Sequence, residues 1–279
     1  MPTTIRVAHS PDSDDAFMFY ALATGKIDTG DIEFIHELQD IETLNRRALA
    51  AELEVTAVSI HAYAYLSDKY ALLPHGASMG EGYGPRLVAR QPYTRADLGN
   101  IVVAVPGTLT SAYLALKLYA PNVQTVVVPF DEILERVAAG EYEMGLLIHE
   151  GQLTYMDAGL HLVADLGEWW AGETGGLPLP LGGNAIRRDL GPDVIKRASR
   201  MLRDSIAYGL EHRTDALVHA ESYGRGLDRA QTDEFVGMYV NSRTLDYGAD
   251  GRKAVQLFLD RGYEAGVIPH RVTVDFVED

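Results

Sequence analysis

The stretch Ile101-Val102-Val103-Ala104-Val105-Pro106-Gly107 opens the segment that decides the fold. Five apolar residues in front of a Pro-Gly turn predict a buried strand, and the run from Thr110 to Tyr119 predicts a helix after it. The alternation continues with a strand at 123–129, a helix at 131–139 and a strand at 144–148. Strands that alternate with helices are typical of an α/β domain built on a mainly parallel sheet.

A similar unit begins near the amino terminus, so the pattern occurs twice. The expected order there is strand, helix, strand, helix, strand, over residues 5–9, 15–24, 32–38, 41–51 and 55–60. A solenoid would repeat its unit more often than this. Two copies therefore predict two similar α/β lobes with a cleft between them.

We expect the chain to cross between these lobes twice. The first lobe then comprises residues 1–95 and 188–279, and the second comprises residues 96–187. The segment from Gly167 to Gly183 holds six glycines and two prolines, so we predict a long loop there, near the cleft. The largely helical stretch after Pro192 is expected to pack on the first lobe.

Composition excludes several classes of function. The 279 residues carry a formal net charge of −16, which repels nucleic acids and anionic membranes. The absence of cysteine rules out disulfides, thiolate catalysis and cysteine-ligated metals. The histidines lack metal-ligand spacing, and neither a P-loop nor G-x-G-x-x-G occurs, so we expect no metal site and no nucleotide cofactor.

The same features bound the location and the partners. The start of the chain has no leader-like pattern, and no apolar run approaches the roughly 18 residues of a membrane span, so we expect a cytoplasmic protein. The expected partner is a small anionic molecule, which must be held by short-range donors because the overall charge repels it. The oligomeric state stays open.

The residues after the strand at 144–148 form the strongest candidate catalytic element. The apolar run before His149 predicts a strand buried on both faces, and ligands of α/β sheets bind at the carboxyl ends of strands. An imidazole at that position titrates near neutral pH, as a general base requires. The alternative is a histidine that is hydrogen-bonded there for structural reasons.

Two turns at predicted helix starts are candidate binding elements. The turn from Gly107 to Ser111 has hydroxyls and no acid, so Thr110 and Ser111 suit a carboxylate or phosphate at a helix N-terminus, or serve only as N-caps. The turn from Ser10 to Asp15 is acidic and disfavours a second anion. It fits sugar hydroxyls, a divalent cation or plain capping.

Two further motifs complete the set. Arg86, beside a glycine-rich stretch, is a candidate carboxylate clamp, although a plain solvated arginine is the favoured explanation. The sequence Gly76-Ala77-Ser78-Met79-Gly80 matches G-x-S-x-G, but the glycines and Pro85 that follow cannot readily start the helix that a serine nucleophile needs. We therefore do not expect a serine hydrolase.

Taken together, several segments resemble the 1,4-dihydroxy-6-naphthoate synthase family of the futalosine route to menaquinone. The resemblance covers nearly the whole chain, and its most specific part is 148–155. The segments are Ser10-Pro11 with Asp15 and Phe17, Val58-Ser59, Gly107 to Ser111, Ile148-His149-Glu150-Gly151-Gln152-Leu153-Thr154-Tyr155, Gly182-Gly183-Asn184-Ala185-Ile186-Arg187-Arg188, and Tyr239-Val240-Asn241 with Thr244-Leu245-Asp246-Tyr247-Gly248.

The resemblance implies a fold, a reaction and a site. The fold is α/β with two lobes, like type II periplasmic binding proteins, and the reaction is the cleavage of cyclic dehypoxanthinyl futalosine to 1,4-dihydroxy-6-naphthoate by a carbon–carbon lyase without metal or organic cofactor. The family's proton-abstracting histidine falls on His149. The candidate substrate-binding residues are Ser59 with its neighbours Ile60 and His61, Thr110, Ser111, Ser10, Asp14, Asn184 and Arg86.

One departure from the family pattern leaves alternatives open. The family's first turn usually reads Ser-Pro-Cys-Pro-Asn-Asp-Thr, whereas this chain has Asp14 at the asparagine and Ala16 at the threonine. The added negative charge fits either a divergent subgroup with the same reaction or a relative with another ligand. A small anionic solute-binding protein and chorismate dehydratase of the same pathway are the competing functions, and the segment 148–155 favours the synthase.

Overall fold

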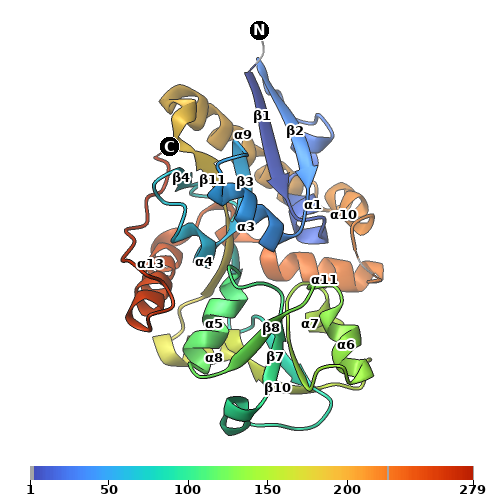
Figure 1. Ribbon diagram of the computed structural model, residues 1–279. Helices are drawn as coiled ribbons and strands as arrows, with labels where there is room; N and C mark the ends of the chain where they lie inside the picture. The colour runs from blue at the N-terminus through green and yellow to red at the C-terminus, as the bar shows by residue number, and fades with distance from the viewer. Residues whose placement is uncertain (1–2, 225, 279) are drawn as a thin grey trace.

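The computed structural model describes residues 3–224 and 226–278. The strands of these residues form a six-stranded and a five-stranded sheet, which lie in the upper and lower halves of an elongated molecule (Figure 1). The six-stranded sheet consists of β1 (Thr3–His9), β2 (Ile32–Leu38), β3 (Val55–Ser59), β4 (Tyr70–Leu72), β5 (Ser78–Gly80) and β11 (Leu179–Arg187). The five-stranded sheet consists of β6 (Arg86–Ala89), β7 (Val102–Val105), β8 (Gln124–Val127), β9 (Met144–Leu147) and β10 (His161–Asp165).

Helices flank both sheets, as the alternation in the sequence predicts. Among the described helices, none combines the length and the apolar character that crossing a bilayer requires. The helical elements are α1 (Ser13–Met18), α2 (Tyr20–Ala23), α3 (Ile41–Leu49), α4 (Ile60–Tyr63), η1 (Arg95–Asn100), α5 (Ser111–Tyr119), α6 (Ile133–Ala139), α7 (Gly151–Thr154), α8 (Leu166–Thr174), η2 (Arg188–Leu190), α9 (Pro192–Glu211), α10 (Arg213–Glu221), α11 (Arg229–Tyr239), α12 (Ser242–Leu245) and α13 (Gly248–Glu264).

Each sheet has a parallel centre with antiparallel additions. β1 pairs in parallel with β2 and β3, and β7 pairs in parallel with β8 and β9. The antiparallel strands include β6, which pairs with β9, and β11, which pairs with β3. These two strands follow the passages of the chain from one half to the other, so they enter their sheets from the opposite direction. The expected α/β class is confirmed, with mixed sheets.

The boundaries between the two halves of the molecule lie at other residues than the sequence predicts. β6 belongs to the five-stranded sheet although it precedes residue 95, and β11 belongs to the six-stranded sheet although it precedes residue 188. The expected limits of 1–95 plus 188–279 and 96–187 therefore assign both strands to the wrong half. The sequence prediction relied on strands that alternate with helices. An antiparallel strand that follows the passage of the chain from one half to the other does not fit this alternation, so its sheet could not be assigned.

The predicted long loop from Gly167 to Gly183 is also wrong, because α8 and the first half of β11 occupy most of it. Asp165 caps α8 by accepting the N–H groups of Gly167 and Glu168 at 2.9 and 3.2 Å. Gly175, with a φ of 70°, ends the helix in the left-handed conformation. Trp170 is fully buried against Phe258, which fixes the helix in place. The glycines therefore end and flank regular elements.

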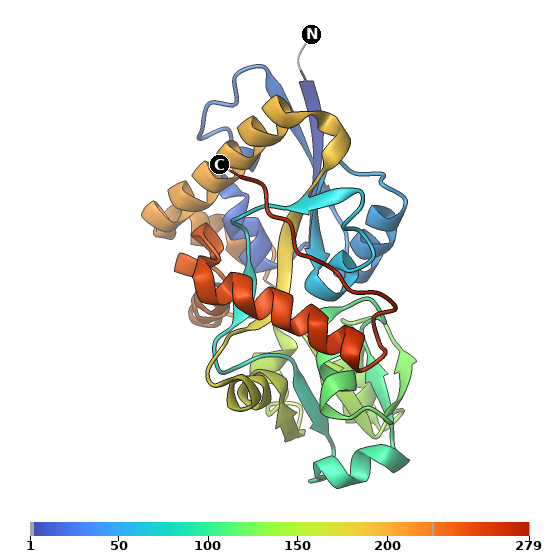
Figure 2. The ribbon, with the colours of Figure 1, turned by 90° about the vertical axis from the view of Figure 1, so that its left-hand side faces the viewer.

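The helices after β11 mostly cover the six-stranded half, as expected. The predicted apolar face of α9 is buried at Ala198, Leu202 and Ile206, and α9 packs on α1 and α2. α13 lies across the junction and contacts α4 of one half and α5 of the other (Figure 2). The chain then returns to the six-stranded half, where Phe276 forms a bridge with Leu72.

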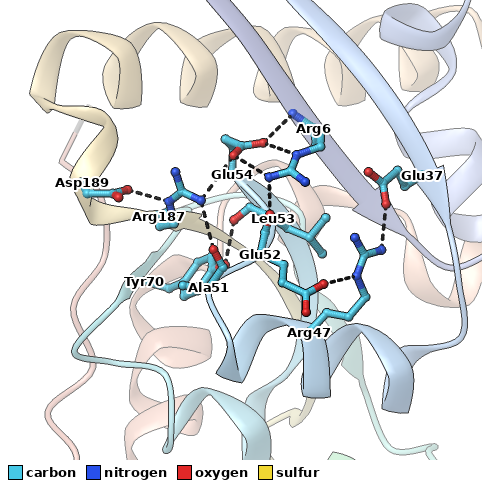
Figure 3. Close-up of polar contacts among 10 residues, drawn as sticks. All are labelled: Arg6, Glu37, Arg47, Ala51, Glu52, Leu53, Glu54, Tyr70, Arg187 and Asp189. Atoms are coloured by element: carbon cyan, nitrogen blue, oxygen red, sulfur yellow. Dashed lines mark hydrogen bonds and ion pairs between the residues drawn. The ribbon is translucent and has the colours of Figure 1, made fainter.

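A cluster of ion pairs connects β1, β3 and β11 of the six-stranded sheet (Figure 3). Glu54, in front of β3, accepts hydrogen bonds from the backbone and side chain of Arg6 on β1, at 2.9–3.0 Å. Arg187, at the end of β11, lies 3.3 Å from the same carboxylate. Burial alone would raise the pKa of Glu54, but the two arginines outweigh it, and the pKa is lowered. One carboxylate therefore ties together three strands of one sheet.

Glu54→Gln should lower the free energy of unfolding by about 1–3 kcal/mol, because it removes the charge partner of Arg6 and leaves Arg187 with Asp189 as its partner. The difference should be complete above the ordinary glutamate pKa of 4.5 and disappear at lower pH, where wild-type Glu54 itself becomes protonated. Urea unfolding at pH 7 and at pH 3.5 measures both effects. Glu52→Gln, which removes an exposed partner of Arg47, is the control and should cost less than about 1 kcal/mol. Equal losses in the two variants would contradict the role of Glu54.

Candidate active site

A pocket lies between the two sheets and takes its lining from both halves of the molecule. One side consists of the turn after β1 and the end of β3, and the other consists of the start of α5 and the residues after β9. These are the carboxyl ends of strands, where α/β sheets bind their ligands. With the open solvent at its mouth included, the pocket has a volume of about 750 Å³.

Most of the residues predicted for the site meet at this pocket. Ile60, His61 and Arg86 are outside its lining. The predicted residues that do line it are Ser10, Asp14, Ser59, Thr110, Ser111, His149 and Asn184.

Arg86 and His61 are engaged in the protein instead of facing the pocket. The guanidinium of Arg86 lies 3.4 Å from the Asp165 carboxylate and donates to the carbonyl of Gln152, so its charge is satisfied inside the five-stranded half. Nδ1 of His61 lies 3.3 Å from the carbonyl of Thr110. Burial lowers the pKa of His61 to about 4, so the imidazole is neutral at pH 7. Both side chains therefore contact other parts of the protein, and Arg86 is an ion-pair partner of Asp165 and not the solvated arginine of the alternative interpretation.

His149 is held in an unusual conformation at the edge of the pocket. It follows β9 and has a φ of 60°, the left-handed region that non-glycine residues seldom adopt, at a cost of about 1–2 kcal/mol. Its Nδ1 lies 2.9 Å from Oδ2 of Asp12, and the ring of Phe130 packs against it with the centroids 4.8 Å apart. The buried Nε2 has no hydrogen-bond partner among residues 3–224 and 226–278. One imidazole nitrogen is therefore committed to Asp12, and the other is buried without a hydrogen-bond partner among the described residues.

The carboxylates around His149 set its protonation. Burial lowers the pKa of the imidazole, but the charge and hydrogen bond of Asp12 act in the other direction, as do the charges of Glu150 and Asp14. The carboxylates outweigh burial and raise the pKa of His149 to about 9. The imidazole carries a proton at neutral pH in this arrangement, and it becomes a strong base once that proton is lost.

The acidic turn that follows β1, from Ser10 to Asp15, carries less negative charge than its sequence suggests. Burial and the neighbouring carboxylates Asp15 and Asp12 raise the pKa of Asp14 well above its ordinary value. Burial and Asp12 also raise the pKa of Asp15 to about 7, although Asp15 accepts the N–H of Ser10 at 2.7 Å. Protonated carboxyls in this turn can donate hydrogen bonds to a ligand. The turn therefore tolerates an anion better than three full charges would.

The hydroxyls predicted to bind an anion are already used by the protein. Thr110 caps α5 by accepting the N–H of Tyr113 at 3.1 Å, and its hydroxyl donates to the carbonyl of Gly107 at 2.9 Å. The hydroxyl of Ser111 donates to the carbonyl of Leu181 and accepts the N–H of His61 at 3.2 Å. The capping alternative is therefore what the structure shows for Thr110.

The N-terminus of α5 keeps the character of an anion site through its backbone. Ser111 and Ala112, the first two helical residues, border the pocket, and N–H groups at these positions have no partner within a helix. Two residues before the helix, the N–H of Leu109 donates to the carboxylate of Glu42 on α3 at 3.2 Å. A protein carboxylate thus already occupies one donor of this turn, as expected for a site that attracts anions.

Buried amides shape the floor of the pocket. Asn45 accepts the N–H of Ser59 at 2.9 Å and donates to its hydroxyl at 3.0 Å, which fixes the turn at the end of β3. Asn184 on β11 lies against Gly76, where an added Cβ would come within 2.1 Å of the amide nitrogen. Gly76 also has a φ of 77°, so both its conformation and its space require glycine.

Asp12, Gln152 and Tyr239 are among the pocket residues that were not predicted from the sequence. Asp12 binds His149 across the pocket, and the hydroxyl of Tyr239 donates to Gln152 at 2.8 Å from the opposite half. Gln152 and Tyr239 both lie in segments that carry the family resemblance, and Asp12 lies in the turn that departs from it. That turn was the available signal for Asp12, but its partner lies far away in the sequence.

Comparison with known proteins identifies relatives along nearly the whole chain. A family described as "Menaquinone biosynthesis" matches residues 5–264. The 1,4-dihydroxy-6-naphthoate synthase of Thermus thermophilus is 43% identical over 251 residues, which are 90% of this chain and 91% of the relative. The enzyme of the same name from Streptomyces coelicolor is 36% identical over 275 residues, 95% of each chain.

Solved structures are also similar to this chain. Protein AF1704 from Archaeoglobus fulgidus superposes with a TM-score of 0.90 and 48% identity, over 95% of this chain and 98% of its own. The alkanesulfonate-binding protein SsuA from Xanthomonas axonopodis pv. citri, solved with MOPS, has a TM-score of 0.73 at 14% identity, over 98% of this chain and 96% of its own. That likeness shows the fold of periplasmic binding proteins. This chain belongs to the menaquinone biosynthesis family.

Proposed function

We propose that this chain is a cytoplasmic 1,4-dihydroxy-6-naphthoate synthase, a lyase that converts cyclic dehypoxanthinyl futalosine to 1,4-dihydroxy-6-naphthoate without metal or organic cofactor. The observation that carries the proposal is the imidazole of His149, a residue that lines the pocket: its Nδ1 is bound to Asp12, and its Nε2 has no hydrogen-bond partner among the described residues. A solute-binding protein has no need of a strained, buried histidine in this position. The names of the two curated relatives support the same reaction.

The proposed mechanism uses His149 as a general base. Its Nε2 removes a proton from the substrate, a carbon–carbon bond breaks, and aromatisation of the new ring supplies much of the driving force. The product is a carboxylate, so the substrate carries one too. The N–H groups of Ser111 and Ala112 are placed to hold that carboxylate or a developing oxyanion. Asp14, with its raised pKa, adds a donor on the opposite wall.

A second function deserves a test because of the fold. The pocket between two sheets and the likeness to an alkanesulfonate-binding protein also fit a protein that captures a small anion without chemistry. Chorismate dehydratase of the same pathway is the remaining alternative. Incubation with each substrate separates these functions, because a binding protein forms no product and a dehydratase consumes chorismate.

His149→Asn should abolish the conversion of cyclic dehypoxanthinyl futalosine, by at least about 100-fold, while substrate affinity stays nearly the same. Asparagine accepts the left-handed conformation of residue 149 well, so the backbone should be preserved. Product formation measured by mass spectrometry, together with calorimetric binding, tests both parts. His161→Asn, on the exposed face of β10, should behave as wild type. Turnover retained by His149→Asn would remove His149 as the base.

The pH dependence provides an independent test of the same role. A base must be neutral to accept a proton, so kcat/KM should rise with pH and level off near 9, the pKa of His149. Below that value it should fall about tenfold for each pH unit, as the neutral imidazole becomes rarer. Initial rates between pH 6 and pH 10 measure the profile. A rate that is constant from pH 6 to pH 9 would show that no such group has to lose a proton.

A further inference from the structure

Asp12 is placed to act on the imidazole of His149. It is the N-cap residue of α1, yet its side chain accepts no capping hydrogen bond. Aspartate in this position normally accepts an N–H of the first helical turn. Here the carboxylate reaches across the pocket instead, with Oδ2 at 2.9 Å from Nδ1 of His149, and Asp12 is only 1% exposed. A carboxylate so deeply buried requires a charged or donating partner, and the imidazole supplies it.

The contact decides which imidazole nitrogen can act on a ligand. A neutral imidazole that donates Nδ1–H to a carboxylate has its lone pair on Nε2. The ring of Phe130 and the left-handed backbone of His149 limit other orientations of the ring. The carboxylate therefore selects both the tautomer and the direction in which the base points.

The two partners come from different halves of the molecule. Asp12 follows β1 of the six-stranded sheet, and His149 follows β9 of the five-stranded sheet. Further hydrogen bonds cross the same junction, among them those from Tyr239 to Gln152 and from Leu109 to Glu42. Any movement that separates the halves also separates Asp12 from His149.

We propose that Asp12 is a positioning residue that completes the base across the pocket, so that His149 is oriented for proton abstraction only while the two halves are together. This inference rests on the proposed function for the identity of the reaction, but the contact itself can be tested without substrate. The titratable groups that face the imidazole are Asp12, Asp14 and Asp15 from the turn after β1, and Glu150 from its own segment.

The first test follows the titration of His149 by NMR of its imidazole carbon-bound protons, with the signal assigned by its loss in His149→Asn. In wild type the midpoint should lie near 9. In Asp12→Asn it should fall by about 1 pH unit or more, because the nearest opposite charge is lost while burial remains. Asp68→Asn, an exposed carboxylate away from the pocket, removes the same charge and should leave the midpoint unchanged. An unchanged midpoint in Asp12→Asn would overturn the proposal.

The second test separates positioning from charge by kinetics. Asp12→Asn should lower kcat roughly 10- to 100-fold with little change in KM, and shift the rise of kcat/KM to lower pH. Asp12→Glu keeps the charge, so it should keep a high midpoint and still lower kcat through the misplaced ring. A wild-type kcat in Asp12→Asn would contradict the positioning role. Absence of turnover in wild type would refute the proposed reaction alone, because the NMR titration still reports on the contact.

Discussion

The ion pair between Asp12 and His149 joins the two halves of this molecule at the pocket, and most features of the site depend on it. It draws a buried carboxylate away from helix capping, holds a histidine in a left-handed conformation and leaves one imidazole nitrogen to a ligand. Neither half of the chain contains this arrangement alone. In the proposed function this imidazole is the group that moves a proton, on a fold that solute-binding proteins share.

The net charge of the protein is −16, but the charge at the pocket is set by the groups that line it. The acidic turn after β1 departs from the usual family pattern, and taken at face value it would repel an anionic substrate. Burial and mutual repulsion raise the pKa of Asp14 and Asp15, so the turn binds protons that relieve part of this charge. On the opposite wall, backbone N–H groups at the start of α5 provide attraction that does not depend on any basic side chain.

The sequence was informative where a local pattern fixes a position in space. The apolar run before His149 predicted a strand end, and the pocket lies there. Thr110 and Ser111 were correctly placed at a helix start, but their hydroxyls are used inside the protein. Contacts between distant segments could not be predicted: Asp12 finds His149, and Arg86 turns to Asp165, only after the sheets have assembled. The glycine-rich segment from Gly167 was misassigned because glycine ends helices as readily as it forms loops.

The position of β11 also has a consequence for the order in which the chain can fold. The strands of the five-stranded sheet lie within residues 86–165, a continuous segment that can form its sheet as soon as it leaves the ribosome. The six-stranded sheet has β11 between β3 and β4, so its centre is incomplete until residue 187 has been synthesised. Pairings between such distant segments are slow to form. The half of the molecule that is translated first is therefore the half that must be completed last.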